Sequence, residues 1–139
     1  MADVFSRAKR SEIMRGIKPR GNRSTELRLL AAFRAAGVCG WRRHSHLPGR
    51  PDFTFHFQRV AVFVDGDFWH GNPRSFKVPM TNSAFWREKI RYNRAKDRRV
   101  ARLLRARGWM VIRIWESTLR RRRDWCVARV VRAVEKRGI

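Results

Sequence analysis

Two neighbouring β-strands are predicted by residues 51–65, which read PDFTFHFQRVAVFVD. Three phenylalanines alternate with polar residues over 52–57, as on one face of a half-buried strand. Residues 60–64 are apolar throughout, which is typical of a strand in the centre of a sheet. Asp52 begins the first strand and Asp65 follows the second, so two carboxylates are expected at neighbouring strand ends.

A helix and a short strand are predicted before this pair. Ser24 is a suitable N-cap, Glu26 lies in the first turn, and Gly37 can end the helix. Four apolar residues are expected to form its buried stripe: Leu27, Leu30, Ala31 and Phe33. A strand near residues 41–45 then leads into the central pair.

A long helix is predicted from a cap at Ser83 to about Arg107, with Gly108 as its stop. Residues at steps of three or four form its inner face: Trp86, Ile90, Asn93, Asp97, Val100 and Leu104. Asp97 therefore points inward and needs a partner. That partner is either one of the many arginines or His70, which a carboxylate would orient and make more basic.

The remaining elements are a further buried strand at 109–115 and a last helix capped by Asp124. Four valines of this helix are expected to face the sheet: Val127, Val130, Val131 and Val134. The order helix, three strands, helix, strand, helix predicts an α/β fold with a small mixed sheet.

The charge of the chain indicates its partner. It contains 34 Lys and Arg against 11 Asp and Glu, a formal net charge of +23. Such a balance is typical of proteins that bind polyanions, and nucleic acid is the default partner. A solvated basic face explains any single arginine but not the whole excess.

The length and hydrophobicity predict one domain, since 139 residues that are 43% hydrophobic can build one modest core. Residues 1–22 are polar, basic and interrupted by Gly and Pro, so we expect a DNA-binding arm that orders on its partner, followed by the domain at 23–139. No apolar run is long enough for a bilayer and no secretory signal is evident, which predicts a cytoplasmic, nucleoid-associated bacterial protein.

A site for phosphodiester hydrolysis is predicted where the strands end. Asp52 and Asp65 are suitable ligands for Mg²⁺, which takes one or two carboxylates together with waters and phosphate oxygens. His70 could remove a proton from the attacking water, because its unperturbed pKa is close to neutral pH. A simpler interpretation stays open, since residues 48–52 and Asp65-Gly66 are also ordinary turn sequences.

A series of motifs runs in register through nearly the whole chain: Arg10-Ser11, Met14-Arg15, Leu47-Pro48-Gly49-Arg50-Pro51-Asp52-Phe53, Phe68-Trp69-His70, Phe76-Lys77-Val78-Pro79, Phe85-Trp86, Glu88-Lys89-Ile90, Asp97-Arg98-Arg99, Gly108-Trp109 and Trp115-Glu116. With these motifs the chain resembles the very short patch repair (Vsr) endonucleases, bacterial enzymes that nick DNA beside a thymine opposite guanine. The resemblance implies a restriction-endonuclease-like core of order αβββαβα, with a mixed central sheet flanked by helices.

The resemblance also implies roles for residues of the site. Asp52 would bind Mg²⁺ together with the backbone carbonyl of Val64, and Glu26 would contact a metal-bound water. His70, paired with Asp97, would act as general base.

DNA contacts are implied as well. Phe68, Trp69 and Trp86 would wedge into the base stack from the major groove, and Met14 would lie in the minor groove. Arg50 and Lys89 stand in the matching motifs as further candidate DNA contacts. A mismatch lowers the cost of unstacking, so wedging gains most where pairing is already poor. The simpler interpretation is that these aromatic residues belong to the core.

Two departures from the family concern its metal sites. Well-studied members hold a structural zinc with cysteines and histidine, whereas this chain has Asp67, Gly71-Asn72-Pro73 and Ser117 at those places, so no zinc site is expected. We expect Asp67 and Ser117 to hydrogen-bond or to brace the loop through water instead. Asp65 stands where those members carry a catalytic histidine, so it is a candidate additional metal ligand and catalytic residue.

The sequence thus predicts a Mg²⁺-dependent, monomeric endonuclease that nicks one strand of double-stranded DNA at T·G mismatches in very short patch repair. Two different functions stay open. One is a restriction- or defence-associated nuclease that cuts DNA without a mismatch, and the other is a non-catalytic DNA-binding protein whose charge alone explains its affinity.

Overall fold

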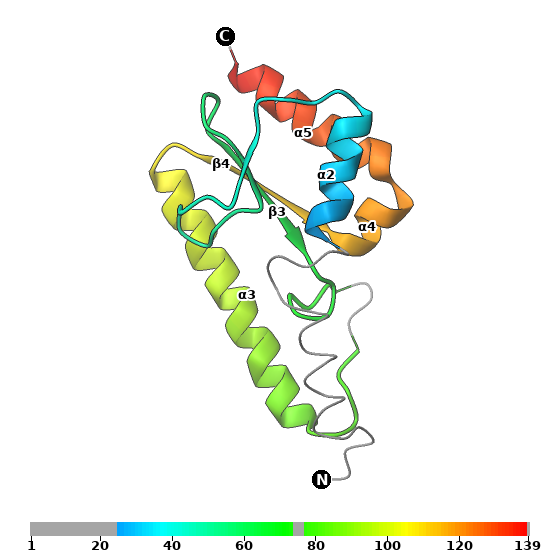
Figure 1. Cartoon of the computed structure of the whole chain (residues 1–139). Helices are drawn as coiled ribbons and strands as arrows, with labels where there is room; N and C mark the ends of the chain where they lie inside the picture. Colours follow the sequence, from blue (N-terminus) through cyan, green and yellow to red (C-terminus); the bar gives the residue numbers. More distant parts are fainter. Residues whose placement is uncertain (1–24, 74–76, 139) are drawn as a thin grey trace.

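The computed structural model describes residues 25–73 and 77–138 (Figure 1). In this part of the chain a short helix precedes three strands, and a long helix leads to the fourth strand and two final helices. The elements are α2 (Glu26–Ala35), β1 (Arg42–Arg43), β2 (Phe53–Phe55), β3 (Val60–Asp65), α3 (Ser83–Ala106), β4 (Met110–Trp115), α4 (Glu116–Arg121) and α5 (Arg123–Arg137). Met14, the predicted arm over 1–22 and the predicted cap at Ser24 lie outside the described residues.

The strands form a mixed sheet of order β1-β2-β3-β4. The first three are antiparallel neighbours, whereas β3 and β4 are parallel with Phe63 opposite Arg113 and Asp65 opposite Trp115. A parallel pair needs a long crossover connection, and α3 provides it. The predicted α/β class is confirmed, since this mixed sheet flanked by helices fits a restriction-endonuclease-like core.

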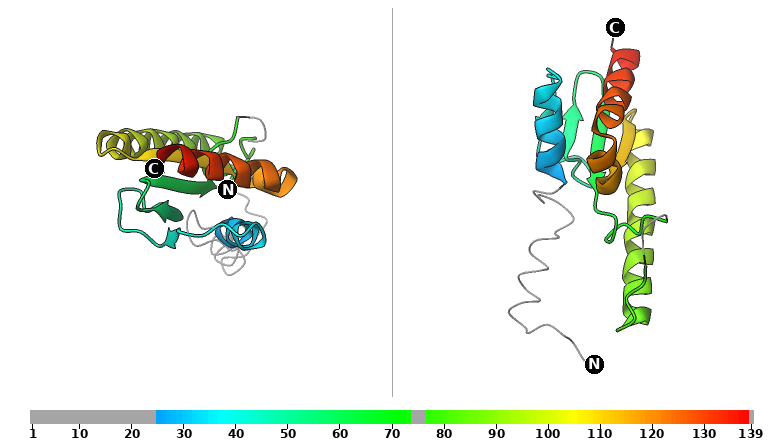
Figure 2. Two further views of the ribbon diagram at one scale, coloured as in Figure 1. Left: turned by 90° about the horizontal axis from the view of Figure 1, so that it is seen from above. Right: turned by 90° about the vertical axis from the view of Figure 1, so that its right-hand side faces the viewer.

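Alternate residues of β3 and β4 face two different layers of the molecule. On one face, Val62 and Ile112 belong to the main core with α2, α4 and α5. On the other face, Phe63 packs with Leu104 of α3 in a smaller cluster. Figure 2 shows α2 and α3 on opposite sides of the strands. As predicted, β3 is buried along its whole length.

The predicted alternation of three phenylalanines was wrong at its end. Phe53 and Phe55 are buried, but Phe57 is 83% exposed because β2 ends at Phe55 and residues 56–59 form the turn into β3. Thr54 is also fully buried, so both faces of β2 are covered.

The predicted buried stripe of α2 was partly wrong. Leu30 and Phe33 are buried as expected, but Leu27 is 38% exposed and Ala31 is exposed. The inward positions belong to Glu26, Leu29 and Ala32 instead. Glu26 can occupy an inward position because Arg43 forms an ion pair with it, with Nη2 of Arg43 2.9 Å from Oε1 of Glu26.

The long helix closely follows its prediction, with small changes at its start. Its six predicted inner residues are buried or half-buried, while most of its other residues are exposed. Ser83 is its first residue, and Asn82 occupies the cap position with a left-handed φ of 57°. Gly108 follows the helix at φ 88°, a conformation that favours glycine.

The C-terminal region differs from its prediction in the burial of β4, in an added helix and in the start and inner face of α5. Of the predicted buried strand, Ile112 and Ile114 are the buried residues. Strand β4 is present, but α4 begins directly after it, and Leu119 is the one buried residue of this short helix. A single apolar position gives no helical periodicity, so the sequence does not reveal α4. Asp124 therefore lies inside the first turn of α5 and does not cap it. Val131 and Val134 are only partly buried, and Cys126 and Ala133 join Val127 and Val130 in the core. Among residues 25–73 and 77–138, every helix is too short or too polar to cross a membrane.

Replacing Phe33 by alanine should destabilise the fold strongly. This ring is fully buried and meets the rings of Phe53 and Phe55 at centroid distances of 5.2 and 6.1 Å. We expect Phe33→Ala to lower the free energy of unfolding in urea by about 3–5 kcal/mol. The exposed Phe57 provides the matched control, and Phe57→Ala should change it by about 0.5 kcal/mol or less. Equal losses in the two variants would contradict this core.

Candidate active site

A pocket of about 590 Å³ opens where the α3-facing side of the sheet becomes polar. Its walls carry the predicted acids Asp52, Asp65 and Asp97 together with His70. Asp52 precedes β2, Asp65 ends β3, and Asp97 comes from α3. The structure therefore brings together four of the five predicted catalytic residues, from segments that are far apart in the sequence.

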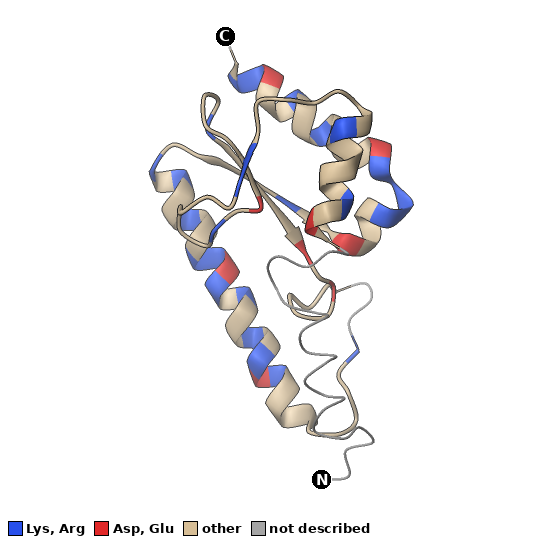
Figure 3. Ribbon diagram, viewed as in Figure 1, with Lys and Arg blue, Asp and Glu red and all other residues tan. Residues whose placement is uncertain are grey.

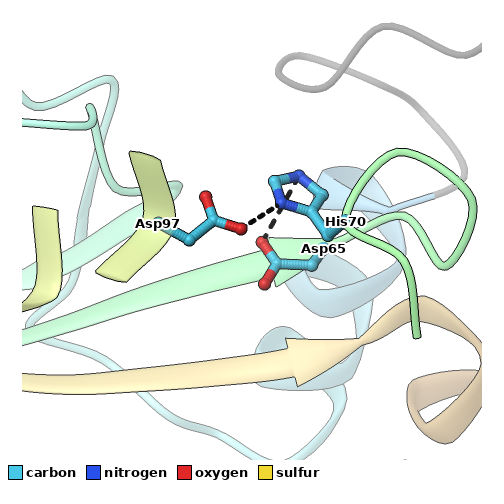
Figure 4. A group of neighbouring side chains, drawn as sticks. All are labelled: Asp65, His70 and Asp97. Carbon is cyan, nitrogen blue, oxygen red and sulfur yellow. Dashed lines mark hydrogen bonds and ion pairs between the residues drawn. The ribbon is translucent and has the colours of Figure 1, made fainter. Parts of the chain in front are cut away.

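The imidazole of His70 lies between two carboxylates (Figure 4). Its Nδ1 donates to Oδ2 of Asp97 at 2.6 Å, and its Nε2 lies 3.7 Å from Oδ1 of Asp65. The predicted pairing of Asp97 with His70 is confirmed. The arginine partner considered for Asp97 is also present, because Nη1 of Arg113 lies 3.6 Å from Oδ1 of Asp97. Ligand atoms of Asp65, His70 and Asp97 all lie within 4.8 Å of one another, so these residues could hold a divalent metal ion.

Asp52 is the acid most strongly affected by its surroundings. Its Oδ2 accepts a hydrogen bond from the backbone N–H of Val64 at 2.7 Å. Burial raises the pKa of Asp52 to about 7, the nearby charges of Glu26 and Asp65 add to the rise, and the Val64 hydrogen bond opposes it. A carboxylate with such a cost of ionisation is well suited to a cation that would offset it.

The pKa values of Asp65 and His70 are both shifted by burial and by the charges around them. Burial raises the pKa of Asp65, while Arg113 and His70 oppose the rise. Burial lowers the pKa of His70, but the hydrogen bond to Asp97 and the charges of Asp65 and Asp97 outweigh it, so the net shift is upward. A divalent cation beside these carboxylates would oppose that upward shift and favour the neutral imidazole that a general base requires.

Glu26 reaches Asp52 from the other side. Glu26 is 2% exposed and pairs with Arg43, and its Oε1 lies 3.9 Å from Nδ1 of His44. Glu26 and Asp52 together line a second pocket of about 220 Å³. Asp52 thus separates the pocket that contains His70 from the pocket that contains Glu26.

Arg113 is a site residue that the sequence reasoning missed. Its Nη1 donates to both carboxylate oxygens of Asp65, at 3.0 and 3.1 Å. Its guanidinium carbon lies 4.1 Å from the centre of the Phe63 ring. The available signal was a single charged residue inside the otherwise apolar run 109–115.

The loop that carries His70 is fixed by Asp67, as predicted. Asp67 accepts hydrogen bonds from the Ser117 backbone N–H at 3.1 Å, the Ser117 hydroxyl at 2.8 Å and the Asn72 amide at 2.7 Å. On the opposite side, Asn93 of α3 donates to the carbonyl of Trp69 at 2.8 Å. Arg94 of α3 also donates to the carbonyl of Gly71. Residues 66–72 are therefore attached to both α4 and α3.

The predicted DNA-contacting aromatic residues form a cluster beside this loop. Trp69 is 7% exposed, with the rings of Phe68 and Trp86 at centroid distances of 5.6 and 6.0 Å. Phe85, which is 58% exposed, packs on Trp86 at 5.0 Å. In this conformation the cluster covers Trp69, so contact of Trp69 with DNA requires the cluster to open.

The two predicted basic contacts are exposed on the described surface. Arg50 lines both pockets and has a left-handed φ of 49°. Lys89 lies on the outer face of α3, with Nζ 5.8 Å from the ring centre of Tyr92. Their contacts with DNA, like those of the aromatic cluster, stay predictions.

Comparison with known proteins identifies the family of the chain. A family model described as DNA mismatch endonuclease Vsr matches residues 2–75. DNA mismatch endonuclease Vsr of Escherichia coli K12 is 42% identical over 123 residues, which cover 88% of this chain and 78% of that protein. The chain belongs to the Vsr family. The match to the Vsr model includes Asp52, Asp65 and His70, whereas Asp97 and Arg113 lie beyond it.

Further relatives carry names that include a nicking activity. The type II nicking enzyme V.NmeDIP of Neisseria meningitidis serogroup C is 34% identical, with 99% of this chain and 94% of that protein covered. The type II nicking enzyme V.XorIIP of Xanthomonas oryzae pv. oryzae is 32% identical, with 86% and 88% covered. The resemblance stated from the motifs is thus confirmed at the level of the Vsr family.

The raised pKa of Asp52 predicts a pH-dependent gain in stability when it is replaced by asparagine. Below about pH 4 the carboxyl is protonated in both the folded and the unfolded chain. Between about pH 4 and 7 the unfolded chain loses this proton first, so folding becomes less favourable, and the loss levels off above about pH 7. Relative to wild type, Asp52→Asn should gain up to about 4 kcal/mol of unfolding free energy by pH 8, from the pKa of about 7. Urea unfolding in EDTA checks this, and a difference that does not vary with pH would contradict it.

Removing the Asp67 carboxylate should loosen the loop that carries His70. We expect Asp67→Ala to lower the free energy of unfolding by about 1–3 kcal/mol, because its three donors lose their acceptor. Amide hydrogen exchange over residues 66–72 should accelerate. Asp124→Ala, which removes a carboxylate that is 95% exposed, is the matched control and should change neither quantity. Unchanged exchange in Asp67→Ala would show that the loop is held by other contacts.

Proposed function

We propose that this chain is a Mg²⁺-dependent endonuclease that nicks one strand of double-stranded DNA at a T·G mismatch, as in very short patch repair. The observation that carries the proposal is the group formed around one pocket by the buried Asp52 and Asp65 and the half-buried His70 and Asp97. Membership of the Vsr family supports the same reaction class. The related enzymes named as mismatch or nicking endonucleases favour cutting of a single strand.

The residues around the pocket fit Mg²⁺. Carboxylate oxygens are hard ligands of the kind this ion prefers. Burial makes the charged forms of Asp52 and Asp65 costly, as their raised pKa values indicate, and a bound cation would offset that cost. Asp52, Asp65 and the Val64 carbonyl would hold the ion, and Glu26 would contact one of its waters. When bound, Mg²⁺ supplies stabilisation of the negative charge that develops on the phosphate.

The hydrolytic proton transfer falls to His70. With its Nδ1–H donated to Asp97, the neutral imidazole presents Nε2 as the base. Nε2 is the nitrogen nearer to Asp65, so it faces the acids that line the pocket. Asp97 fixes the tautomer and the orientation of the ring, as a carboxylate partner does for other functional imidazoles.

The surface charge supports a DNA substrate. Lys and Arg follow α3 along its length and continue over α4 and α5 (Figure 3). Such charges bind the phosphate backbone irrespective of sequence. Selectivity for a mismatch would come from the aromatic residues Phe68, Trp69 and Trp86, which would insert into the base stack. Arg50, Lys89 and the arm at 1–22, which includes Met14, would hold the duplex. We propose that the enzyme acts on the duplex as a monomer.

The second candidate function is a restriction-associated nuclease. The names of several relatives as type II nicking enzymes favour it over a DNA-binding protein without catalytic activity. It differs from the first in cutting DNA that contains no mismatch.

A nicking assay separates these functions. Labelled duplexes, fully paired or with one T·G pair, are incubated with the protein in Mg²⁺ or EDTA beside Asp52→Asn and Asp97→Asn. We expect a Mg²⁺-dependent nick in one strand of the mismatched duplex, reduced at least about 100-fold in both variants, since each loses a charge that the reaction requires.

Three different results would change the conclusion. Equal cutting of paired DNA would favour the restriction-associated nuclease. Binding without cutting in any duplex would leave a non-catalytic DNA-binding protein. Full activity in Asp97→Asn would remove the proposed role of Asp97, and Asp124→Asn serves as the exposed control for loss of one negative charge.

A further inference from the structure

Arg113 occupies a position where the sheet would ordinarily carry an apolar residue. It lies on the α3-facing side of β4, directly opposite Phe63 in the parallel register. Its neighbours on that face, Phe63 and Val111, pack into the smaller hydrophobic cluster. An arginine at such a position is costly unless a partner offsets its charge. Asp65 is that partner, and the Phe63 ring supports the guanidinium at 4.1 Å.

Only one nitrogen of this guanidinium, Nη1, donates hydrogen bonds to the described part of the protein. Both hydrogen bonds to Asp65 and the close approach to Asp97 come from Nη1. Nε is buried without a partner among the described residues. Nη2 donates no hydrogen bond within that same part of the chain and, unlike Nε, keeps accessible surface, on a residue that lines the pocket.

The remaining walls of the pocket indicate what this open donor could bind. Asp52, Asp65 and Asp97 are already the acceptors there, and Arg50 and Lys96 add two further positive charges. A ligand for Nη2 therefore has to bring its own acceptor oxygen into a site of several carboxylates. Guanidinium groups match phosphate oxygens in shape and charge, and they stay protonated in such surroundings.

We propose that Arg113 is a further catalytic residue, which donates from Nη2 to a non-bridging oxygen of the scissile phosphate. This inference rests on the proposed nuclease function and deepens it. Asp65 and Phe63 hold the guanidinium before substrate arrives, so little reorganisation is needed when charge accumulates on the phosphate. Preorganised donors in a site with restricted water are worth about 10²–10³-fold in rate each.

The test is single-turnover nicking of the mismatched duplex by Arg113→Gln and Arg113→Lys. We expect Arg113→Gln to slow the nick about 100-fold or more while duplex affinity changes less than about 3-fold, since one donor to the reacting phosphate is lost. Arg113→Lys should keep the charge beside Asp65, and with it the fold, but should not restore the full rate, because a lysine lacks the second donor of the fork. Arg34→Gln, on the exposed surface of α2 and outside the basic surface of α3, α4 and α5, is the control for loss of one positive charge and should nick at the wild-type rate.

Sulfur substitution at the nicked phosphate distinguishes contact with substrate from a merely structural role. Replacing the contacted non-bridging oxygen by sulfur should slow the wild type in one diastereomer. We expect this thio effect to shrink in Arg113→Gln, because the contact is already absent. Thio effects equal to wild type in both Arg113 variants, or full activity of Arg113→Lys, would overturn the proposal. If the wild type itself does not nick, the proposed function fails rather than this inference alone.

Discussion

The burial of two carboxylates, Asp52 and Asp65, in one pocket at the edge of the sheet is the constraint on which the rest of this structure depends. Burial penalises the charged forms of Asp52 and Asp65, and the negative charges near each of them add to that cost. Three groups of the chain offset part of this cost. Arg113 and the imidazole of His70 lie beside Asp65, and the Val64 N–H donates to Asp52. What remains is the cost of ionising the buried Asp52 and Asp65, in a protein that is otherwise strongly basic.

The topology explains how these groups come to one place. Parallel pairing of β3 with β4 requires a crossover, and the crossover helix α3 brings Asp97 over the end of β3. The loop between β3 and α3 carries His70, and its position is set from two directions. Asp67 joins the loop to Ser117 at the start of α4, and Asn93 joins it to α3. A short helix without a clear sequence signal thus contributes to the placement of His70.

Sequence reasoning found the parts of this arrangement that follow from local patterns. The apolar run of β3, the inner face of α3 and the inward direction of Asp97 are periodic features, and the structure confirms them. It missed Arg113, because an arginine in a strand can be assigned to solvent until the covering helix is known. It also misplaced the stripe of α2, where Glu26 takes an inward position only because Arg43 of β1 neutralises it. Such errors arise because these pairs join residues that are distant in the sequence, and local periodicity does not reveal them.

The central claim is that a divalent cation in this pocket offsets the cost of ionising the buried Asp52 and Asp65. Crystals soaked in Mn²⁺, which takes oxygen ligands as Mg²⁺ does and scatters anomalously, test it most directly. The account predicts an anomalous peak within coordination distance of the Asp52 and Asp65 carboxylates, with the imidazole of His70 still bonded to Asp97. A pocket without a peak at saturating Mn²⁺, in which the protein's own basic residues are the sole counter-charges, would contradict it.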